Sequence, residues 1–378
     1  MLLPSDYNNL ETFLKILVDE LSKSTKTTYY FAHLETKLNV RKLISLFSIP
    51  IYPSRLYKYF KLLGNHLSLK HKLVNIYVNI DLLTYRKIDI IHSTFSNLII
   101  GNYFIGKIYN AQISIGLRGY DITYFPVTHK NCYNTDFWNH IDFIQTNSSD
   151  LYQYALKWGA NAKTPIFKIN AAVNDDFILD VNDIKIRDNF DSGIIKLLFI
   201  GRLHWKKGLD SLVRLILISR GSNSKLQLSV IGDGPEFEKF TYLIWKYDLQ
   251  DQIHLLGKLN QNAIINNIDK ADIVIAPSIQ EGCSNVVLES QARGKFCIVS
   301  DAEGMNEVIQ VDETGFTFKE FDELSILKLI DIYVNYNYQE RTEIAISTIK
   351  RISENFRRSK QIGEWEYYFN EFINVCVH

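Results

Sequence analysis

The second half of the chain alternates short apolar, β-rich runs with longer segments of helical periodicity, and this constrains the fold most strongly. Strands and helices that alternate in this way form parallel sheets with helices on both faces. The runs are almost continuously apolar, which is typical of strands that are covered on both faces. The predicted strands are Ile194–Gly201, Leu226–Gly232, Ile253–Gly257, Asp272–Pro277, Phe296–Ser300 and Gly315–Phe318.

The first half repeats this pattern less regularly. The sequence predicts a helix near Glu11–Ser22 and strands near Tyr29–His33, Asp89–His92, Gln112–Leu117, Phe143–Thr146 and Ile166–Ile169. The 378 residues suffice for two domains of ordinary size. We therefore predict two α/β domains, residues 1–175 and 193–356, joined by the polar residues 176–192 as a linker.

Composition excludes several classes of protein. Lys and Arg number 42, as do Asp and Glu, and a net charge of zero argues against a dedicated nucleic-acid binder. The neutrality is a sum of two halves: residues 1–170 hold 19 basic and 11 acidic side chains, so they carry +8 and the remainder −8. The four cysteines have no C-x-x-C spacing, which favours a reducing, cytoplasmic location.

The sequence indicates neither export nor a transmembrane helix. The first residues lack the basic stretch followed by an apolar stretch that is typical of an export signal. No run approaches the roughly 18 apolar residues of a membrane-spanning helix. Residues 55–73 do interleave Lys and Arg with leucine and aromatic side chains. This segment has two interpretations, a peripheral contact with an anionic membrane surface or an ordinary amphipathic helix with its lysines in water.

Chemistry-bearing residues first appear in Phe199–Gly208, where a buried strand ends at Gly201 and a loop follows with Arg202 and Lys207. Ligands bind at the carboxyl edge of open α/β sheets, and a guanidinium with an ammonium suits the oxygens of a diphosphate. A solvated basic turn is the alternative. The next turn, with Gly232 and Gly234, is not the G-x-G-x-x-G fingerprint, so a nicotinamide cofactor is not indicated.

The most informative stretch is Ala276–Ser290, A-P-S-I-Q-E-G-C-S-N-V-V-L-E-S, which leads from a strand into a helix. Amides at the start of that helix favour an anion. Glu281 and Glu289 are eight residues apart, and their carboxylates could accept hydrogen bonds from the vicinal hydroxyls of a sugar and a ribose. Alternatively, Glu289 complements the helix dipole and Glu281 is simply exposed. Together with Arg202 and Lys207, the stretch outlines a nucleotide-sugar site.

These elements resemble those of the retaining glycosyltransferases of family four. Gly201–Gly208 is similar to their G-R-x-x-x-x-K-G element, and Glu281–Glu289 to their E-x7-E element. The resemblance covers residues 194–356 densely. It implies the GT-B fold, with two Rossmann-like domains whose parallel sheets face each other across a cleft, and a last helix, residues 357–378, that rejoins the first domain.

The resemblance also implies residue roles. Arg202, Lys207 and Glu281 would be catalytic, with the two cations on the donor diphosphate and Glu281 on the transferred sugar. Glu289 would contact the ribose. The remaining donor-binding residues implied are Gly201, Gly232, Gly257, Lys258, Leu259, Gly282, Asn285, Val286 and Val287.

The first half resembles the exopolysaccharide branch of that family, of the colanic-acid and amylovoran type, more loosely. Pro4 and Glu11–Phe13 look like the P…E-T-F motif at the start of that branch's sequences. Asp89–His92 looks like the D-x-x-H motif at the end of one of its strands. Arg118-Gly119-Tyr120-Asp121 stands where relatives usually have His-Gly-Tyr-Asp, so Arg118 either changes sugar or acceptor choice or is anchored by Asp121. The acceptor-side residues implied are Glu11, His92, Arg118 and Asp121, with His129 as a further candidate.

The resulting prediction is a hexosyltransferase that moves a sugar from a UDP- or GDP-linked donor to a saccharide acceptor, lipid-linked, in surface polysaccharide synthesis. No H-x-x-x-H, H-E-x-x-H or strand-end D-x-D pattern is present, so neither a metal nor a separate cofactor is expected. The alternatives are a sugar-nucleotide epimerase or hydrolase of the same fold, and a non-catalytic nucleotide-sugar-binding partner of another transferase. A cytoplasmic protein, peripheral at the inner face of the cytoplasmic membrane, is expected.

Overall fold

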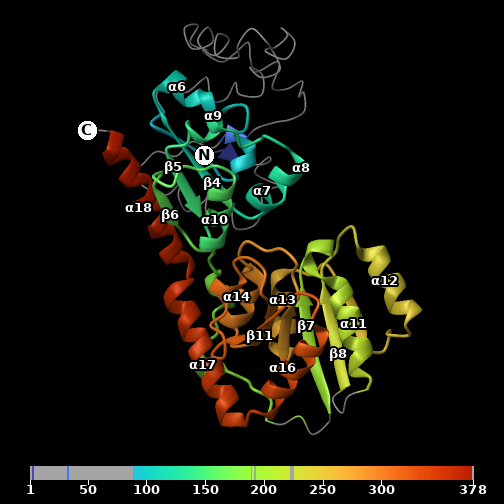
Figure 1. The fold of residues 1–378 in the computed structure, drawn as a ribbon. Coiled ribbons are helices and arrows are strands. Elements are labelled where there is room, and N and C mark those ends of the chain that lie inside the picture. The colour runs from blue at the N-terminus through green and yellow to red at the C-terminus, as the bar shows by residue number, and fades with distance from the viewer. Residues whose placement is uncertain are drawn as a thin grey trace, which may run out of the picture. The chain divides into compact units, whose positions relative to one another are not determined.

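The computed structural model of the chain describes residues 88–188, 190, 193–221 and 225–376, together with the strand residues 2–3 and 32–33 (Figure 1). The chain divides into two compact units. Unit 1 comprises Met1–Ile169 and Ile362–His378, and unit 2 comprises Asn170–Gln361. The predicted helix Glu11–Ser22 and the basic segment 55–73 lie outside the described residues, and so does Glu11.

Unit 2 contains a parallel sheet of strand order β12-β11-β10-β7-β8-β9. The chain builds β7, β8 and β9 outward from the centre and then adds β10, β11 and β12 on the other side of β7, as in doubly wound nucleotide-binding folds. Each strand confirms its prediction to within one residue at either end. The strands are β7 (Ile194–Ile200), β8 (Lys225–Ile231), β9 (Ile253–Gly257), β10 (Ile273–Ala276), β11 (Phe296–Ser300) and β12 (Gly315–Phe318).

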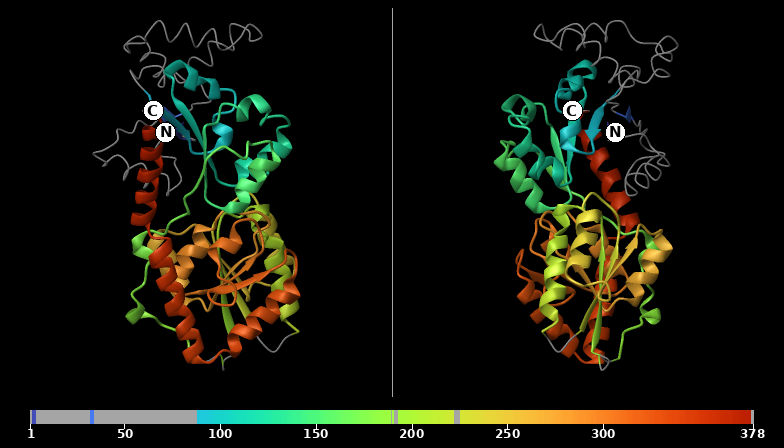
Figure 2. Two further views of the ribbon diagram at one scale, coloured as in Figure 1. Left: turned by 60° about the vertical axis from the view of Figure 1, so that its left-hand side comes forward. Right: turned by 90° about the vertical axis from the view of Figure 1, so that its right-hand side faces the viewer.

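Helices cover both faces of this sheet (Figure 2). Successive side chains of a strand point to opposite faces, so Leu197 and Phe199 of β7 pack with α11, α12 and α16, while Leu198 packs with α13, α14 and α17. The helices are α11 (Leu209–Ser219), α12 (Phe237–Lys246), α13 (Gln261–Lys270), α14 (Asn285–Ala292), α15 (Met305–Val308), α16 (Glu323–Asn335) and α17 (Tyr338–Asn355), with short turns η4 (Asp175–Phe177), η5 (Val181–Asp183) and η6 (Trp205–Lys207).

Unit 1 contains a second parallel sheet of order β2-β1-β3-β4-β5-β6. Its strands are β1 (Leu2–Leu3), β2 (Ala32–His33), β3 (Ile90–Ser93), β4 (Gln112–Leu117), β5 (Phe143–Thr146) and β6 (Ile166–Lys168). Its described helices are η2 (Ser96–Leu98), η3 (Tyr103–Ile105), α6 (Gly106–Tyr109), α7 (Tyr120–Thr123), α8 (Phe125–Thr128), α9 (Thr135–Trp138) and α10 (Ser149–Lys157). The predicted strands at 112–117 and 143–146 are confirmed residue for residue.

The last helix, α18 (Arg358–Cys376), begins in unit 2 and supplies core residues to unit 1. Trp365, Tyr368 and Phe369 are buried in one cluster with Phe143 and Ile169. The sheet of unit 1 therefore buries part of its apolar surface under residues that lie about 200 positions later in the chain. Among the described helices, none is both long enough and apolar enough to cross a bilayer.

Residues 176–192 do not form a separate linker where they are described. Phe177 is buried against unit 2, and the Leu179 amide donates to the Ala292 carbonyl at 3.0 Å. The Arg341 guanidinium donates to the Asp188 carbonyl at 2.8 Å. The predicted domain boundaries at residues 175 and 357 are thus displaced, and the chain passes between units after Ile169 and after Gln361. The acidic and amide side chains that suggested a linker belong to a segment whose apolar residues pack on unit 2.

Candidate functional site

The loops that follow β7 and β10 meet at one edge of the unit 2 sheet. These two strands are hydrogen-bonded neighbours, with Leu197 opposite Ile273. After β7 the chain continues toward β8 on one side, whereas after β10 it continues toward β11 on the other. Ligands of doubly wound folds bind outside the carboxyl ends of strands at such a switch point. The predicted donor-binding motifs therefore lie at the position that the topology favours.

The loop after β7 is held close to the end of β10. Gly208 has φ +65°, and a Cβ atom there would lie 1.9 Å from the Pro277 carbonyl oxygen. Only glycine permits both this left-handed conformation and this approach. The Lys206 carbonyl oxygen accepts a hydrogen bond of 2.7 Å from the Ile279 amide, which ties the two loops together. Arg202 is exposed on this loop, and no described residue bonds to its guanidinium.

Lys207 and Glu281, predicted from separate motifs, form an ion pair through Nζ and Oε2. Both side chains are half-buried. An ammonium has three N–H donors, so Lys207 can contact Glu281 and still donate to the oxygens of an anion. The pair also fixes where the Glu281 carboxylate lies.

Helix α14 begins beside these side chains with its first amides uncapped. Ser284 is the N-cap residue, but its side chain makes no capping hydrogen bond. Asn285 is exposed and Val286 is half-buried, whereas Val287 packs in the core. The amides of a first helical turn carry the positive end of the helix dipole, and they can bind phosphate oxygens. Buried Gly282 lies in the loop that leads to this helix.

Glu289 lies one turn into α14 and is half-buried. Burial raises the pKa of its carboxyl to about 7, and the positive charge of Arg358 opposes that rise. Arg358 donates from Nη2 to the Ala172 carbonyl at 3.4 Å and from Nη1 to Gln361 at 3.3 Å. A carboxyl with a pKa near 7 accepts hydrogen bonds through both oxygens only above neutral pH.

The two remaining predicted glycines have different roles. Gly232 has φ +141°, and a Cβ atom there would lie 1.8 Å from the Gly201 carbonyl oxygen, so it serves the packing of one loop on another. Its amide donates to the Gly257 carbonyl at 2.9 Å. Gly257 has φ +67° with open space beside it. Lys258 is exposed and Leu259 half-buried, so this short stretch can lie against a planar group.

Sequence reasoning missed two cationic or titratable neighbours on the β7 loop. His204 and Lys206 lie between Arg202 and Lys207, and burial lowers the pKa of each. Nearby lysines and Arg202 lower that of His204 further, whereas Glu281 acts in the opposite direction on Lys206. The run H-W-K-K was visible in the sequence, but the G-R-x-x-x-x-K-G motif specifies no residue type at positions 204 and 206.

The acceptor-side residues of unit 1 behave differently from the prediction. His92 is buried, its Nδ1 lies 2.7 Å from Ser114 Oγ, and its ring packs edge-on against Trp365 at 5.2 Å. Burial holds the pKa of His92 well below its usual value. This placement corrects the prediction that His92 contacts an acceptor, because core side chains cover its imidazole ring.

Asp121 is also fully buried, and its carboxylate builds a turn. Its oxygens accept from the amides of Ser96, Arg118 and Gly119, each at 3.0 Å, and from Ser96 Oγ at 2.8 Å. Burial raises the pKa of Asp121 despite these bonds. Asp121 thus anchors the backbone of Arg118, while the Arg118 guanidinium donates to the Thr94 carbonyl at 3.3 Å and lies 5.6 Å from the Trp365 ring.

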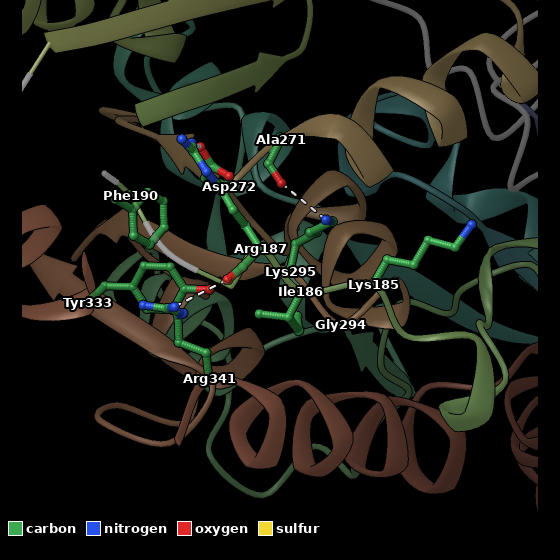
Figure 3. Close-up of a pocket in the computed structure, with 10 residues that line it drawn as sticks. All are labelled: Lys185, Ile186, Arg187, Phe190, Ala271, Asp272, Gly294, Lys295, Tyr333 and Arg341. Carbon is green, nitrogen blue, oxygen red and sulfur yellow. Dashed lines mark hydrogen bonds and ion pairs between the residues drawn. The ribbon is translucent and has the colours of Figure 1, made fainter. Parts of the chain in front are cut away.

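A pocket at the amino edge of the unit 2 sheet is also lined by cations, but they serve the fold (Figure 3). Lys295 Nζ donates to the carbonyls of Asp269 and Ala271, at the end of α13. Arg341 donates to the Val334 carbonyl at 3.2 Å, at the end of α16. Helix C-termini present unsatisfied carbonyls and negative potential, which these cations neutralise. Lys295 and Arg341 are therefore engaged with the chain's own carbonyls. Within the described ranges no three metal-binding side chains come together.

Comparisons with known proteins agree with this geometry. Residues 180–351 match the family model of glycosyl transferases group 1. The uncharacterized glycosyltransferase MJ1069 of Methanocaldococcus jannaschii is 28% identical over 198 residues, 51% of this chain and 49% of that protein, so the chain spans about half the length of this relative. An uncharacterized 41.2 kDa protein in the cps region of Klebsiella pneumoniae is 24% identical over 314 residues, 78% of this chain and 82% of that protein.

Among solved structures, Anabaena Alr3699/HepE in complex with UDP aligns with a TM-score of 0.70 at 15% identity over 98% of both chains. Residues 180–351 are thus similar to the glycosyl transferases group 1, and the two parallel sheets of the chain have the GT-B architecture. This confirms the predicted fold class.

Proposed function

We propose that this chain is a retaining glycosyltransferase of family four that moves a hexose from a nucleotide diphosphate-sugar to a saccharide acceptor. The observation that carries the proposal is the convergence of Arg202, the Lys207–Glu281 pair and the start of α14 at the switch point of the unit 2 sheet. Cations and helix amides suit a diphosphate, and carboxylates suit sugar hydroxyls.

The proposed chemistry depends on the leaving group. As the bond between the anomeric carbon and the phosphate oxygen breaks, negative charge grows on the diphosphate. Arg202, Lys207 and the α14 amides stabilise that charge, and one such preorganised donor is worth about 3–4 kcal/mol. The acceptor hydroxyl attacks the same face of the sugar, its oxygen forms the new bond to the anomeric carbon, and its proton passes to the departing phosphate oxygen. Neither a metal nor a separate cofactor enters this scheme.

The relatives support the biological setting of the proposal. The Klebsiella relative is encoded in a cps region, and HepE was crystallised with UDP, so a surface-polysaccharide acceptor and a UDP-linked donor are the first choices, with GDP-linked sugars next. The proposed location is the cytoplasm, at the inner face of the cytoplasmic membrane, where a lipid-linked acceptor is accessible. Residues 55–73 would make the peripheral contact, and replacing their cations should weaken sedimentation with anionic vesicles.

The donor is identified first by thermal shift with UDP-, GDP-, ADP- and dTDP-sugars, because a ligand at 100 times its Kd stabilises the folded chain by about 2.7 kcal/mol. Turnover is then compared in Arg202→Ala, Lys207→Ala and Glu281→Ala. Each should lose about 10²–10³-fold in kcat while the fold survives. Lys225→Ala is the control, since Lys225 is an exposed cation at the amino end of β8. Near-full turnover in all three variants would refute the assignment.

Product analysis separates the alternatives. A transferase leaves most donor intact without an acceptor, whereas an epimerase or hydrolase converts it. Donor binding without turnover over a broad acceptor panel would indicate a non-catalytic partner of another transferase.

A further inference from the structure

Helix α18 begins with a half-buried cation, Arg358, whose charge acts on the Glu289 carboxyl of α14. Of the charged groups in the described ranges, Arg358 is the one that opposes protonation of Glu289. In return, Glu289 is the first of two carboxyls that favour the charged guanidinium, and Asp175 of η4 is the second. Glu289 and Arg358 are therefore electrostatic partners, although they belong to different helices.

The core of unit 2 fixes where these two side chains lie. Leu288, next to Glu289, is buried in one cluster with Val173 and Phe356, and Phe356 lies two residues before Arg358. The Val173 amide donates to the Phe356 carbonyl at 2.8 Å, which ties the segment before α18 to the segment that enters unit 2. Because close-packed residues flank both side chains, packing sets their relative position.

The Arg358 guanidinium is bonded only weakly to the chain. Nη2 lies 3.4 Å from the Ala172 carbonyl oxygen and Nη1 lies 3.3 Å from Gln361 Oε1, both long for an N–H···O hydrogen bond. Nε is buried and has no hydrogen-bond partner. Buried guanidinium donors are ordinarily bonded, so this side chain gains little from its hydrogen bonds. Its charge, rather than its bonding, distinguishes it from a neutral side chain at this position.

The positive charge matters because Glu289 is half-buried. Burial raises the pKa of the Glu289 carboxyl to about 7, and without Arg358 the pKa would rise further. An ionised carboxylate accepts hydrogen bonds through both oxygens, whereas a protonated one has committed one oxygen to its own proton. Arg358 therefore increases the fraction of molecules whose Glu289 can accept from two hydroxyls at neutral pH.

The other cations around α14 and the start of α18 have partners of their own. These pairs are Arg293 with Asp269, Arg351 with Gln291, and Arg357 with Asp175. Removing the charge of Arg358 should therefore leave Glu289 without a compensating cation among the described residues.

We propose that Arg358 is a positioning residue that keeps the Glu289 carboxylate ionised, so that the carboxylate can bind the vicinal hydroxyls of the donor ribose at neutral pH. The inference rests on the proposed function and adds a regulation to it. Donor affinity falls as the pH is lowered, and Arg358 sets the pH at which it falls. Arg358 itself touches no substrate in this scheme and acts through Glu289.

The test measures donor affinity of the full chain by calorimetry between pH 5.5 and 8.5. The probe is UDP-glucose, or the glucose donor of the base that thermal shift selects, because its diphosphate keeps a constant charge over this range. Arg358→Gln should weaken binding about threefold or more at pH 7 and much less at pH 8.5, since Glu289 then keeps its proton to higher pH. Arg358→Lys should restore the wild-type profile.

Arg357→Gln is the matched control. Arg357 is the adjacent cation but is exposed, and its guanidinium lies 3.5 Å from Asp175, so its loss should leave the pH profile of donor binding unchanged. A loss of affinity in Arg358→Gln that is equal at every pH would indicate a merely structural role and would overturn the inference. Binding by Glu289→Gln that equals wild type at every pH would overturn it as well.

Unfolding of the ligand-free chain gives a second readout. Since the pKa of Glu289 is higher in the folded chain than in the unfolded one, its contribution to the free energy of unfolding is lost as the pH rises through the folded value. In Arg358→Gln this loss should occur at higher pH, and an unchanged profile would overturn the inference. Failure of wild type to bind any nucleotide-sugar would instead count against the proposed function, while the unfolding profiles still report on Arg358 and Glu289.

Discussion

The carboxyl edges of the two sheets use their charged residues in opposite ways. In unit 2, Arg202 is exposed and the Lys207–Glu281 pair is half-buried, so the charges remain available to a ligand. In unit 1, Asp121 and His92 are buried. The Asp121 carboxylate and the Nδ1 atom of His92 are engaged with the chain itself, and core side chains pack against the His92 ring. The same kind of motif residue thus stays accessible to a ligand at one edge and supports the fold at the other, and burial distinguishes the two positions.

Replacing one carboxylate at each edge should give the largest contrast. Asp121→Ala leaves the amides of Ser96, Arg118 and Gly119 buried without their acceptor, which should lower the free energy of unfolding by about 3–5 kcal/mol. Glu281→Ala should change it by less than about 1 kcal/mol, since that ion pair is partly solvated. Urea denaturation followed by tryptophan fluorescence measures both, and equal losses would contradict the contrast.

Backbone glycines provide the next comparison. Gly208→Ala adds a Cβ atom 1.9 Å from the Pro277 carbonyl oxygen in a left-handed conformation, and should cost about 2–4 kcal/mol and displace the β7 loop. Gly101→Ala in unit 1 is the matched control, because Gly101 has φ +80° but open space around it. It should cost only about 1 kcal/mol. The measurement is thermal or urea unfolding of both variants, with donor binding as a second readout for Gly208→Ala.

The two units should respond to acid in opposite directions. Burial raises the pKa of Glu289 to about 7, so the folded chain keeps a proton that the unfolded carboxyl, with a pKa near 4.5, releases. Its contribution to the free energy of unfolding therefore rises, by about 1–3 kcal/mol, as the pH falls from 7 toward 5. The lowered pKa of His92 acts the other way, because below pH 6.5 the unfolded imidazole takes up a proton that the folded one does not.

Unfolding of Glu289→Gln and His92→Gln between pH 5 and 8 tests this sign. Glu289→Gln should remove the rise in the free energy of unfolding that acidification causes. His92→Gln should remove the corresponding fall. Identical pH profiles for wild type and Glu289→Gln would show that the carboxyl titrates in the ordinary acidic range. Donor affinity should follow the same group and weaken as Glu289 takes up its proton.

The smallest expected effect concerns left-handed residues. In unit 1 the described non-glycine residues with positive φ are Asn110 and Asn131, a residue type that tolerates this conformation, whereas unit 2 places Phe321 there with φ +63°. Phe321→Asn should raise the free energy of unfolding by about 0.5 kcal/mol, the relief of strain exceeding the loss of the contact with Arg214 at 5.7 Å. A lower melting temperature would show that the exposed ring stabilises the fold.

Much of unit 2 was predictable because its determinants are local. Each strand is an apolar run, and the donor motifs follow the strands directly, so Arg202 and Glu281 could be placed at one edge from spacing alone. The role of His92 was not predictable, since the rings that cover it belong to α18, far along the chain. Residues 176–188 were misassigned because their composition is polar, although Phe177 anchors them to unit 2.

The return of α18 to unit 1 has a consequence for the order of folding during synthesis. Unit 2 is one continuous segment, Asn170–Gln361, and can complete its core as soon as it leaves the ribosome. Unit 1 is translated first, yet Trp365, Tyr368 and Phe369 join its core only after unit 2 has been made. Unit 1, which is translated first, therefore completes its core last. Until α18 has been made, the face of its sheet that carries His92 lacks the side chains that cover it in the folded chain.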